Sequence, residues 1–250
     1  MPLRTTRTGR VAVLVLDDPE RRNALTRELI QDIVRHVNIF ETSGDVGALV
    51  ITGTPPAFCA GADVSGLAAL VGAGGKGAQA LRDIYAAFLR VRSSPLLTVA
   101  AVNGAAIGAG LNLALACDVR IVSPDARFDS RFVSIGLHPG GGHSWLLERA
   151  VGPQAAAAMV LFGESIDGDR AVELGLAWRC VPEAELLDAA VALAAHGAEA
   201  PPDLNARAKA SLRDAPWRAT FDDAVTAELG PQLWSLDQPF FKPGRETPSD

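Results

Sequence analysis

A long uncharged segment constrains this chain more than any other feature. From Ser93 to Cys117 there is no charged side chain, which meets the length criterion for a membrane-spanning helix. Turn-forming and polar residues interrupt it at Pro95, Asn103, Gly104, Gly108, Gly110 and Asn112. We therefore expect a buried strand from Leu96 to Val102, a glycine turn and a buried helix from Ala109 to Cys117, with no membrane span.

The composition narrows the class of protein. The 250 residues are 48% hydrophobic and 21% charged, which is ordinary for a folded, soluble protein. With 23 basic and 29 acidic side chains the formal net charge is −6, so we do not expect nucleic acid as a partner. A few arginines or a helix N-terminus could still hold phosphate groups locally.

The cysteine pattern indicates the compartment. Cys59, Cys117 and Cys180 are an odd number and form no C-x-x-C pair, so we expect neither a disulfide framework nor a metal site. The first ten residues lack the apolar stretch of a secretory signal. A reducing, cytoplasmic location is the prediction.

Strand and helix patterns alternate through the first half of the chain. Strands are expected at Val11–Leu16, Ala48–Thr52, Leu96–Val102 and Val119–Val122, and helices at about Thr26–Phe40, Ala78–Arg92 and Ala109–Cys117. This order predicts an α/β architecture with mostly parallel strands. A glycine-rich loop is expected at Gly72–Gly77.

The last part of the chain reads as helical. Helices are expected at Gln154–Phe162, Asp169–Leu174, Glu183–His196 and Leu204–Arg213, with one strand signal at Ala177–Val181. We divide the chain into a core, residues 1–195, and a helical C-terminal region with its tail, residues 196–250. The alanine-rich surface between Gln154 and Arg213 favours self-association, and the tail after Gln238 looks loose or held by a partner.

Three familiar motifs are absent. Gly74-Gly75-Lys76 has Leu70 and Gly77 where a phosphate loop needs glycine and Ser or Thr. The stretch from Gly104 to Gly110 is not G-x-G-x-x-G and has no acidic residue at the right distance, which argues against a dinucleotide site. No G-x-S-x-G occurs, so the nucleophile elbow of serine hydrolases is missing.

Two loops of small residues each follow a buried strand. They are Phe58–Asp63 and Asn103–Gly110. Small residues let a ligand approach the backbone closely, and two such loops could present two N–H donors to an oxyanion. They also permit tight packing of helix against sheet, and both interpretations remain open here.

A third loop, Gly136–Trp145, carries two histidines. His138 and His143 are side chains suited to proton transfer near neutral pH. The alternative is a surface loop with solvated histidines.

Taken together, several short motifs resemble a known family. They are Asn23-Ala24-Leu25, Phe58-Cys59-Ala60-Gly61-Ala62-Asp63, Ala100-Ala101-Val102-Asn103-Gly104, Gly108-Ala109-Gly110, Cys117-Asp118, Ala126-Arg127-Phe128, Gly136 and Pro139-Gly140. In this order and spacing they are similar to the enoyl-CoA hydratase/isomerase family of the crotonase superfamily. The match covers roughly residues 10–200.

The resemblance implies a fold and a ligand. The fold would be α/β, a crotonase-like spiral of βαβ repeats with a helical C-terminal trimerisation region, assembled as a homotrimer or as a hexamer of two trimers. The ligand would be an acyl-CoA or enoyl-CoA thioester from fatty-acyl-CoA metabolism, and the activity that of a lyase or isomerase. No permanently bound cofactor is implied, because coenzyme A is part of the substrate.

The resemblance also implies site residues. The backbone N–H groups of Ala62 and Ala109 would form the oxyanion hole that stabilises a thioester enolate. Other residues would line the substrate: Arg21, Arg22, Ala24, Ala60, Gly61, Asp63, Gly108, Pro139 and Gly140.

Two departures from the family pattern bear on activity. Asn112 and Phe132 stand where hydratases carry glutamates, and neither can exchange a proton. His138 and His143, and Asp129 nearby, are conjectural replacements. One hypothesis is therefore an enzyme with weak or unusual hydratase chemistry. The other is a protein that binds acyl-CoA without catalysis.

Overall fold

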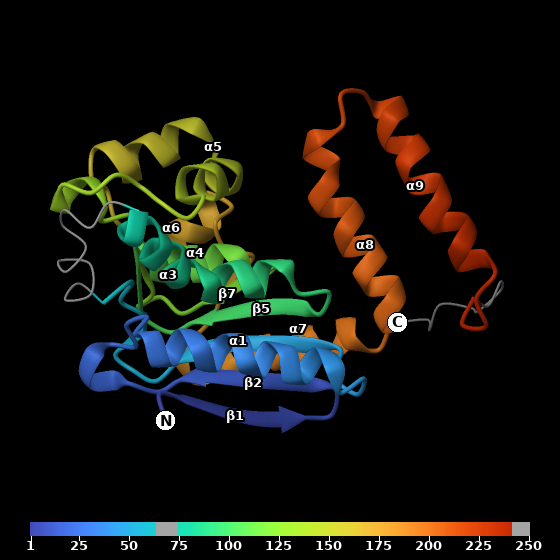
Figure 1. Ribbon diagram of the computed structural model, residues 1–250, viewed down its shortest axis with the longest axis horizontal. Helices are drawn as coiled ribbons and strands as arrows, with labels where there is room; N and C mark the ends of the chain where they lie inside the picture. The colour runs from blue at the N-terminus through green and yellow to red at the C-terminus, as the bar shows by residue number, and fades with distance from the viewer. Residues whose placement is uncertain (64–74, 242–250) are drawn as a thin grey trace.

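The computed structural model describes residues 1–63 and 75–241, and its strands form two sheets (Figure 1). The larger sheet has the order β1 (Leu3–Thr8), β2 (Val11–Leu16), β3 (Ala48–Gly53), β5 (Leu97–Val102), β7 (Val119–Val122), β10 (Arg179–Cys180). The smaller has the order β4 (Ala57–Cys59), β6 (Ala105–Ile107), β8 (Arg127–Asp129), β9 (Ile166–Asp167).

The chain winds between the sheets as a spiral. β3 leads into β4, β5 into β6, and β7 into β8, so each turn of the spiral adds one strand to each sheet. The pairs β2–β3, β3–β5, β5–β7, β4–β6 and β6–β8 are parallel, which confirms the prediction of mostly parallel strands. The carboxyl ends of β4 and β6 therefore meet at one edge of the smaller sheet.

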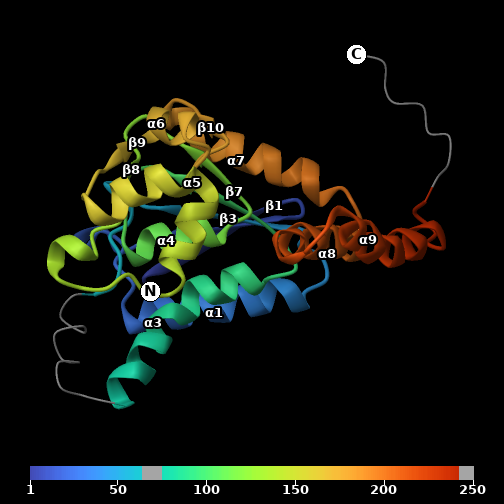
Figure 2. The ribbon, with the colours of Figure 1, turned by 90° about the horizontal axis from the view of Figure 1, so that it is seen from above.

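Helices cover both faces of the larger sheet, which explains its nearly continuous apolar strands. Leu49 and Ile51 of β3 face the core under α1 (Arg27–Thr42), α3 (Gly75–Ser93) and α4 (Ala109–Ala116). Ala48 and Val50 face α7 (Glu183–Ala198) on the other side. Figure 2 shows the sheet between these two helix layers.

The uncharged segment folds as predicted. It forms β5, a turn containing β6, and α4, and every residue of α4 is buried. Within the described residues, we find no helix with the length and apolar character needed to cross a membrane.

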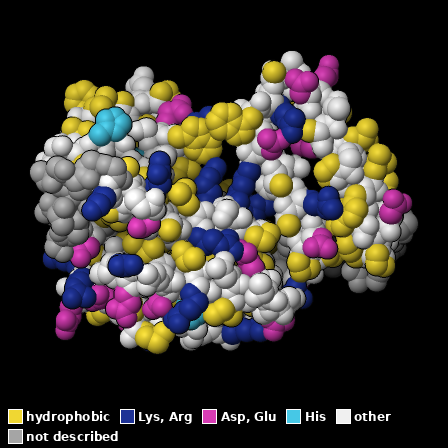
Figure 3. Space-filling view, in the orientation of Figure 1, with side chains coloured by type: hydrophobic (Ala, Val, Ile, Leu, Met, Phe, Trp, Pro, Cys, Tyr) yellow, Lys and Arg dark blue, Asp and Glu magenta, His cyan; other side chains and the backbone are white. Residues whose placement is uncertain are grey.

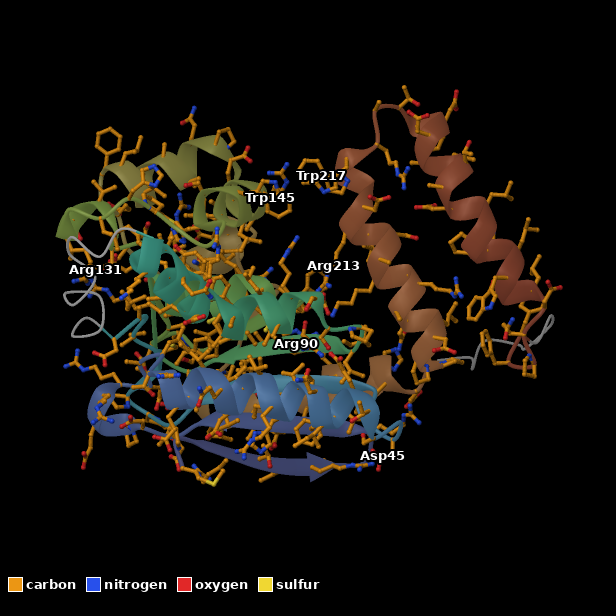
Figure 4. The ribbon with its side chains drawn as sticks, in the orientation of Figure 1. Asp45, Arg90, Arg131, Trp145, Arg213 and Trp217 are labelled. Carbon is orange, nitrogen blue, oxygen red and sulfur yellow. The ribbon has the colours of Figure 1, made fainter. Side chains whose placement is uncertain are left out.

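The C-terminal part contains α5 (His143–Leu161), α6 (Gly168–Glu173), α8 (Pro202–Asp214) and α9 (Phe221–Leu236). α8 and α9 form a hairpin beside the body (Figure 1). The Lys209 ammonium lies 2.6 Å from the Asp118 carboxylate, and the Trp145 and Trp217 rings stack with centroids 5.6 Å apart. Figure 4 shows these two tryptophans where the body meets the hairpin.

Several expectations need correction. α5 begins at His143 rather than Gln154 and kinks at Gly152, where φ is 77°. Strand β1, the strands β4, β6, β8 and β9 of the smaller sheet, and helix α9 were not expected. Gly75, Lys76 and Gly77 open α3 and are not a loop, whereas 72–74 lie outside the described residues, as do 242–250 of the expected tail. α7 passes through residue 195, and the two-part division stays a prediction.

Candidate active site

The two small-residue loops contact each other at the edge of the smaller sheet. A Cβ atom added to Gly61 would lie 2.7 Å from the Ile107 carbonyl oxygen and 3.6 Å from the Ala109 nitrogen. A Cβ atom on Gly110 would collide with the Cys59 carbonyl. The tight-packing interpretation of these glycines is therefore correct, and that packing brings the Gly61–Ala62 peptide next to the start of α4.

Two backbone amides remain unengaged at this contact. Across residues 1–63 and 75–241, neither the Ala62 nor the Ala109 N–H donates to a backbone or side-chain acceptor. Ala109 is the first residue of α4, where a helix leaves its N–H groups without partners. Gly108 turns the chain into α4 with φ 52° and ψ −111°, a conformation suited to glycine.

The stretch from Arg21 to Leu25 lies against the first loop. The Ala60 N–H donates to the Arg22 carbonyl at 3.0 Å, and the Leu25 N–H donates to the Gly61 carbonyl at 2.7 Å. The buried Asn23 amide donates to two carbonyls of the β3–β4 turn, 2.8 and 2.7 Å away. Arg21 and Arg22 are exposed and Ala24 is partly buried, and the backbone hydrogen bonds hold this stretch beside the loop.

A buried side-chain network centres on Asn112, about one turn of α4 after Ala109. His143 Nδ1 lies 2.7 Å from Asn112 Oδ1, and His143 Nε2 lies 2.8 Å from Ser130 Oγ. The Asn112 amide donates to the Gly140 carbonyl at 3.1 Å. Asn112, Ser130 and His143 are each 1% exposed.

This network fixes the protonation of His143. Because the Asn112 Nδ2 group donates to Gly140, its Oδ1 accepts from His143, so Nδ1 carries the proton and Nε2 accepts from the Ser130 hydroxyl. Burial lowers the pKa of His143 from 6.5 to about 4. The imidazole is therefore neutral at pH 7.

Phe132 closes the network on one side. Its ring centroid lies 4.9 Å from that of His143, and a Cβ atom on Gly108 would lie 3.8 Å from the Phe132 Cζ. Asn112 and Phe132, the two residues that the family resemblance predicts at glutamate positions, thus both contact His143. Phe132 is itself partly exposed, so it stands between the network and solvent.

The remaining predicted residues lie apart from this network. His138 is exposed, and its Nδ1 lies 2.8 Å from the Pro139 carbonyl oxygen. The Asp129 carboxylate pairs with the Arg131 guanidinium at 2.7 Å. Gly140 packs against the Tyr85 hydroxyl. Ser130 was not singled out from the sequence as a site residue, because its position as a partner of His143 depends on the packing of β8 against α5.

A groove leads away from the first loop. Its volume is about 940 Å³, and it runs between α1 and α3 from Leu25 and Asp63. Ile30, Val34 and Ile84 give it an apolar floor. No cluster of three potential metal-ligating side chains occurs among the residues that the structure describes.

Figure 4 places Arg131, the neighbour of Ser130 and Phe132, far from Trp217 and Arg213 on the hairpin side. Trp145, two residues after His143, instead stacks on Trp217 where the body meets the hairpin.

Comparisons with known proteins agree with this architecture. The chain matches the family model described as Enoyl-CoA hydratase/isomerase over residues 6–230. It is 46% identical over 236 residues to the probable enoyl-CoA hydratase EchA14 of Mycobacterium tuberculosis, covering 92% of this chain and 91% of that protein. It is 37% identical over 210 residues to the 2,3-dehydroadipyl-CoA hydratase of Escherichia coli, covering 83% and 80%.

A solved structure gives the same result for the fold. An enoyl-CoA hydratase from Polaromonas sp. JS666 superposes with a TM-score of 0.88 at 30% identity, covering 94% of this chain and 91% of that one. The predicted α/β crotonase fold is thus confirmed. On these grounds the chain belongs to the enoyl-CoA hydratase/isomerase family of the crotonase superfamily.

Proposed function

We propose that this protein binds an acyl-CoA or enoyl-CoA thioester and holds its carbonyl oxygen with the N–H groups of Ala62 and Ala109. The observation that carries the proposal is the pair of unengaged amides on two contacting loops. Donors aimed at one oxygen stabilise the negative charge that develops there when a thioester forms an enolate. The N-terminal end of α4 adds a favourable dipole.

The rest of the ligand extends from this point along residues already described. The coenzyme A part lies by Arg21, Arg22 and Ala24, where exposed guanidinium groups can meet its phosphates. The acyl part enters the groove beside Leu25 and Asp63. Ala60, Gly61 and Gly108 allow the thioester to approach the backbone closely. Pro139 and Gly140, fixed by Asn112, form the opposite wall. No permanently bound cofactor is part of the proposal.

Hydration by this site is weak. Asn112 and Phe132 offer no exchangeable proton, and general acid–base groups contribute about 10²–10⁴-fold each. His143 has both ring nitrogens engaged and is buried, so it does not face a water on the substrate. His138 is exposed, in contact with Pro139 alone among the contacts described for its ring.

The hydrogen-bonded network of Asn112, His143 and Ser130 also supports a second candidate function. A protein that binds acyl-CoA without hydrating it needs the two amides and no acid–base pair. The complete engagement of Asn112 and His143 favours this alternative.

Assembly completes the proposal. α9 exposes a row of apolar side chains, among them Phe221 at 81% and Leu229 at 52%, and hydrophobic side chains gather over this hairpin in Figure 3. Such a surface is typical of an interface. We include a homotrimer, or two trimers as a hexamer, in a cytoplasmic setting of fatty-acyl-CoA metabolism.

Calorimetric titration with acyl-CoA thioesters of several chain lengths tests the binding. Crotonyl-CoA hydration, followed by loss of the enoyl absorbance, then separates the two candidates. Fast hydration that His143→Ala or His138→Ala removes identifies that histidine as the acid–base group and excludes the binding protein. Absence of any thermal response to acyl-CoA contradicts the proposal itself. Light scattering at micromolar concentration tests the assembly, and a monomer contradicts it.

A further inference from the structure

The side-chain network has an order that hydration does not require. The Ser130 hydroxyl donates to His143 Nε2, and His143 Nδ1–H donates to Asn112 Oδ1. A hydroxyl, an imidazole and a group that orients the imidazole are the three parts of an activated nucleophile in acyl transfer. The contacts that keep His143 from hydration are thus the ones that such a nucleophile needs.

Ser130 also lies next to the turn that presents the Ala109 amide. Ile107 of β6 pairs with Asp129 of β8, so the next residues along the two strands are Gly108 and Ser130. The Gly108 N–H donates to the Asp129 carbonyl at 2.9 Å. Neighbouring strands are about 5 Å apart. Ser130 is therefore one strand spacing from the turn that presents the Ala109 amide.

We propose that this protein hydrolyses acyl-CoA thioesters, with Ser130 as the nucleophile, His143 as the base and Asn112 as the residue that orients His143. The inference rests on the proposed function, because the Ala62 and Ala109 amides hold the carbonyl oxygen during attack. It requires no nucleophile elbow, since Ser130 is placed by the end of β8 instead.

The reaction proceeds in two balanced steps. Ser130 Oγ bonds to the thioester carbon while His143 Nε2 takes its proton. The carbon–sulfur bond breaks, and the sulfur takes that proton and leaves as free coenzyme A. Water then attacks the carbonyl carbon of the serine ester and gives a proton to His143 Nε2. The bond between that carbon and Ser130 Oγ breaks, and Oγ takes the proton from His143. The products are a carboxylic acid and the original hydroxyl.

Access to Ser130 runs past Phe132. Ser130 and His143 are each 1% exposed, whereas the Phe132 ring is partly exposed and lies on His143. The thioester displaces this ring to reach Ser130.

The test measures free coenzyme A by liquid chromatography after incubation with an acyl-CoA. We expect release by the unmodified protein and a loss of about 100-fold or more in Ser130→Ala. Ser134→Ala is the matched control, because Ser134 is an exposed serine of the same loop whose hydroxyl donates to the Arg131 carbonyl. Its rate should equal that of the unmodified protein. Mass spectrometry of a rapidly quenched reaction should find the acyl group on Ser130.

Two results overturn the inference. They are absence of coenzyme A release by the unmodified protein, and release by Ser130→Ala at the unmodified rate. If Ser130→Ala does not fold, Ser130→Cys keeps a nucleophile at nearly the same volume and should carry the acyl group as a thioester. Calorimetry with a thioether analogue, which cannot be hydrolysed, separates the two proposals. Binding without release overturns hydrolysis and leaves the proposed function, whereas absence of binding removes both.

Discussion

Two sets of polar groups around α4 differ in how they are used. The backbone amides of Ala62 and Ala109 have no acceptor among the described residues. The side chains of Asn112, His143 and Ser130 satisfy one another inside the core. A buried polar group without a partner costs about 1–3 kcal/mol, so unengaged donors mark where a ligand is expected. Polar side chains that already have hydrogen-bond partners are held in place by the fold. The comparison teaches that, of these two sets, the one left without partners among the described residues belongs to the backbone, whereas the polar side chains of the network are satisfied.

Placing glutamates at the two positions where the family resemblance predicts them should have the largest effect. Asn112→Glu together with Phe132→Glu should raise crotonyl-CoA hydration by about 10²-fold or more, because each acid–base group contributes about 10²–10⁴-fold. Hydration assays on the folded double variant check this. Asn112→Gln with Phe132→Gln is the matched control, with similar volume and no proton to transfer. A hydration rate in the unmodified protein equal to that of the glutamate variant contradicts the prediction.

Acid should destabilise the protein through the network of Asn112, His143 and Ser130. The unfolded chain protonates His143 near pH 6.5, whereas the folded chain resists protonation until about pH 4. The stabilisation from neutral His143 is therefore complete above pH 6.5 and is lost as the pH falls toward 4. At about 1.4 kcal/mol per pKa unit, the free energy of unfolding should fall by about 3 kcal/mol across this window.

Urea unfolding at a series of pH values measures that slope. His143→Phe keeps an aromatic ring and should lack this part of the pH dependence, although its overall stability is lower. His138→Ala, altered at an exposed position, should retain it. Equal slopes for the unmodified protein and His143→Phe would show that His143 is not held neutral by burial.

The pair of unengaged amides can be altered by a substitution that removes one backbone N–H group. Ala109→Pro removes one N–H at the first position of a helix, where proline is tolerated. Loss of one hydrogen bond to the thioester oxygen should weaken binding about 10-fold. Isotope-edited infrared spectra should also show a smaller shift of the bound carbonyl stretch. Ala109→Ser keeps the N–H and should behave as the unmodified protein. An unchanged spectrum in the proline variant places the carbonyl elsewhere.

Filling the groove should have the smallest effect. Ile84→Trp narrows the space between α1 and α3 and should weaken binding of long acyl chains several-fold, by about 1 kcal/mol, with little effect on acetyl-CoA. Calorimetry across a chain-length series checks this. Leu89→Trp, on the exposed side of α3 outside this groove, is the control. Equal loss for short and long chains would mean that the groove holds another part of the ligand.

Sequence patterns predicted the central strands of the larger sheet well, because both faces of these strands are buried. β3 and β5 are continuous apolar runs because helices cover both faces of their sheet. β1 escaped prediction because it is an edge strand: only Leu3 of its six residues is buried. α9 escaped because its apolar side chains are exposed in the single chain. Local sequence patterns reflect burial, and these two elements bury few side chains in the single chain.

The candidate site divides in the same way. The small-residue loops could be located from sequence because glycine and alanine recur after each strand. The Asn112–His143 contact could not, since it joins residues on α4 and α5 that are brought together by packing. His138 and His143 look equivalent in the sequence, yet one is exposed and the other is buried. Only the start of α5 at His143 separates them.

The close contact between Gly110 and Cys59 makes the reactivity of Cys59 a measure of local opening. Burial raises the pKa of the Cys59 thiol to about 12, and the same holds for Cys117 at the other end of α4. A thiol reagent can modify either group only while β4 and α4 are apart. Labelling of Cys59 therefore counts how often this junction opens, with the more accessible Cys180 as the reference on the same chain. Any ligand that bridges the two loops should lower the labelling rate of Cys59.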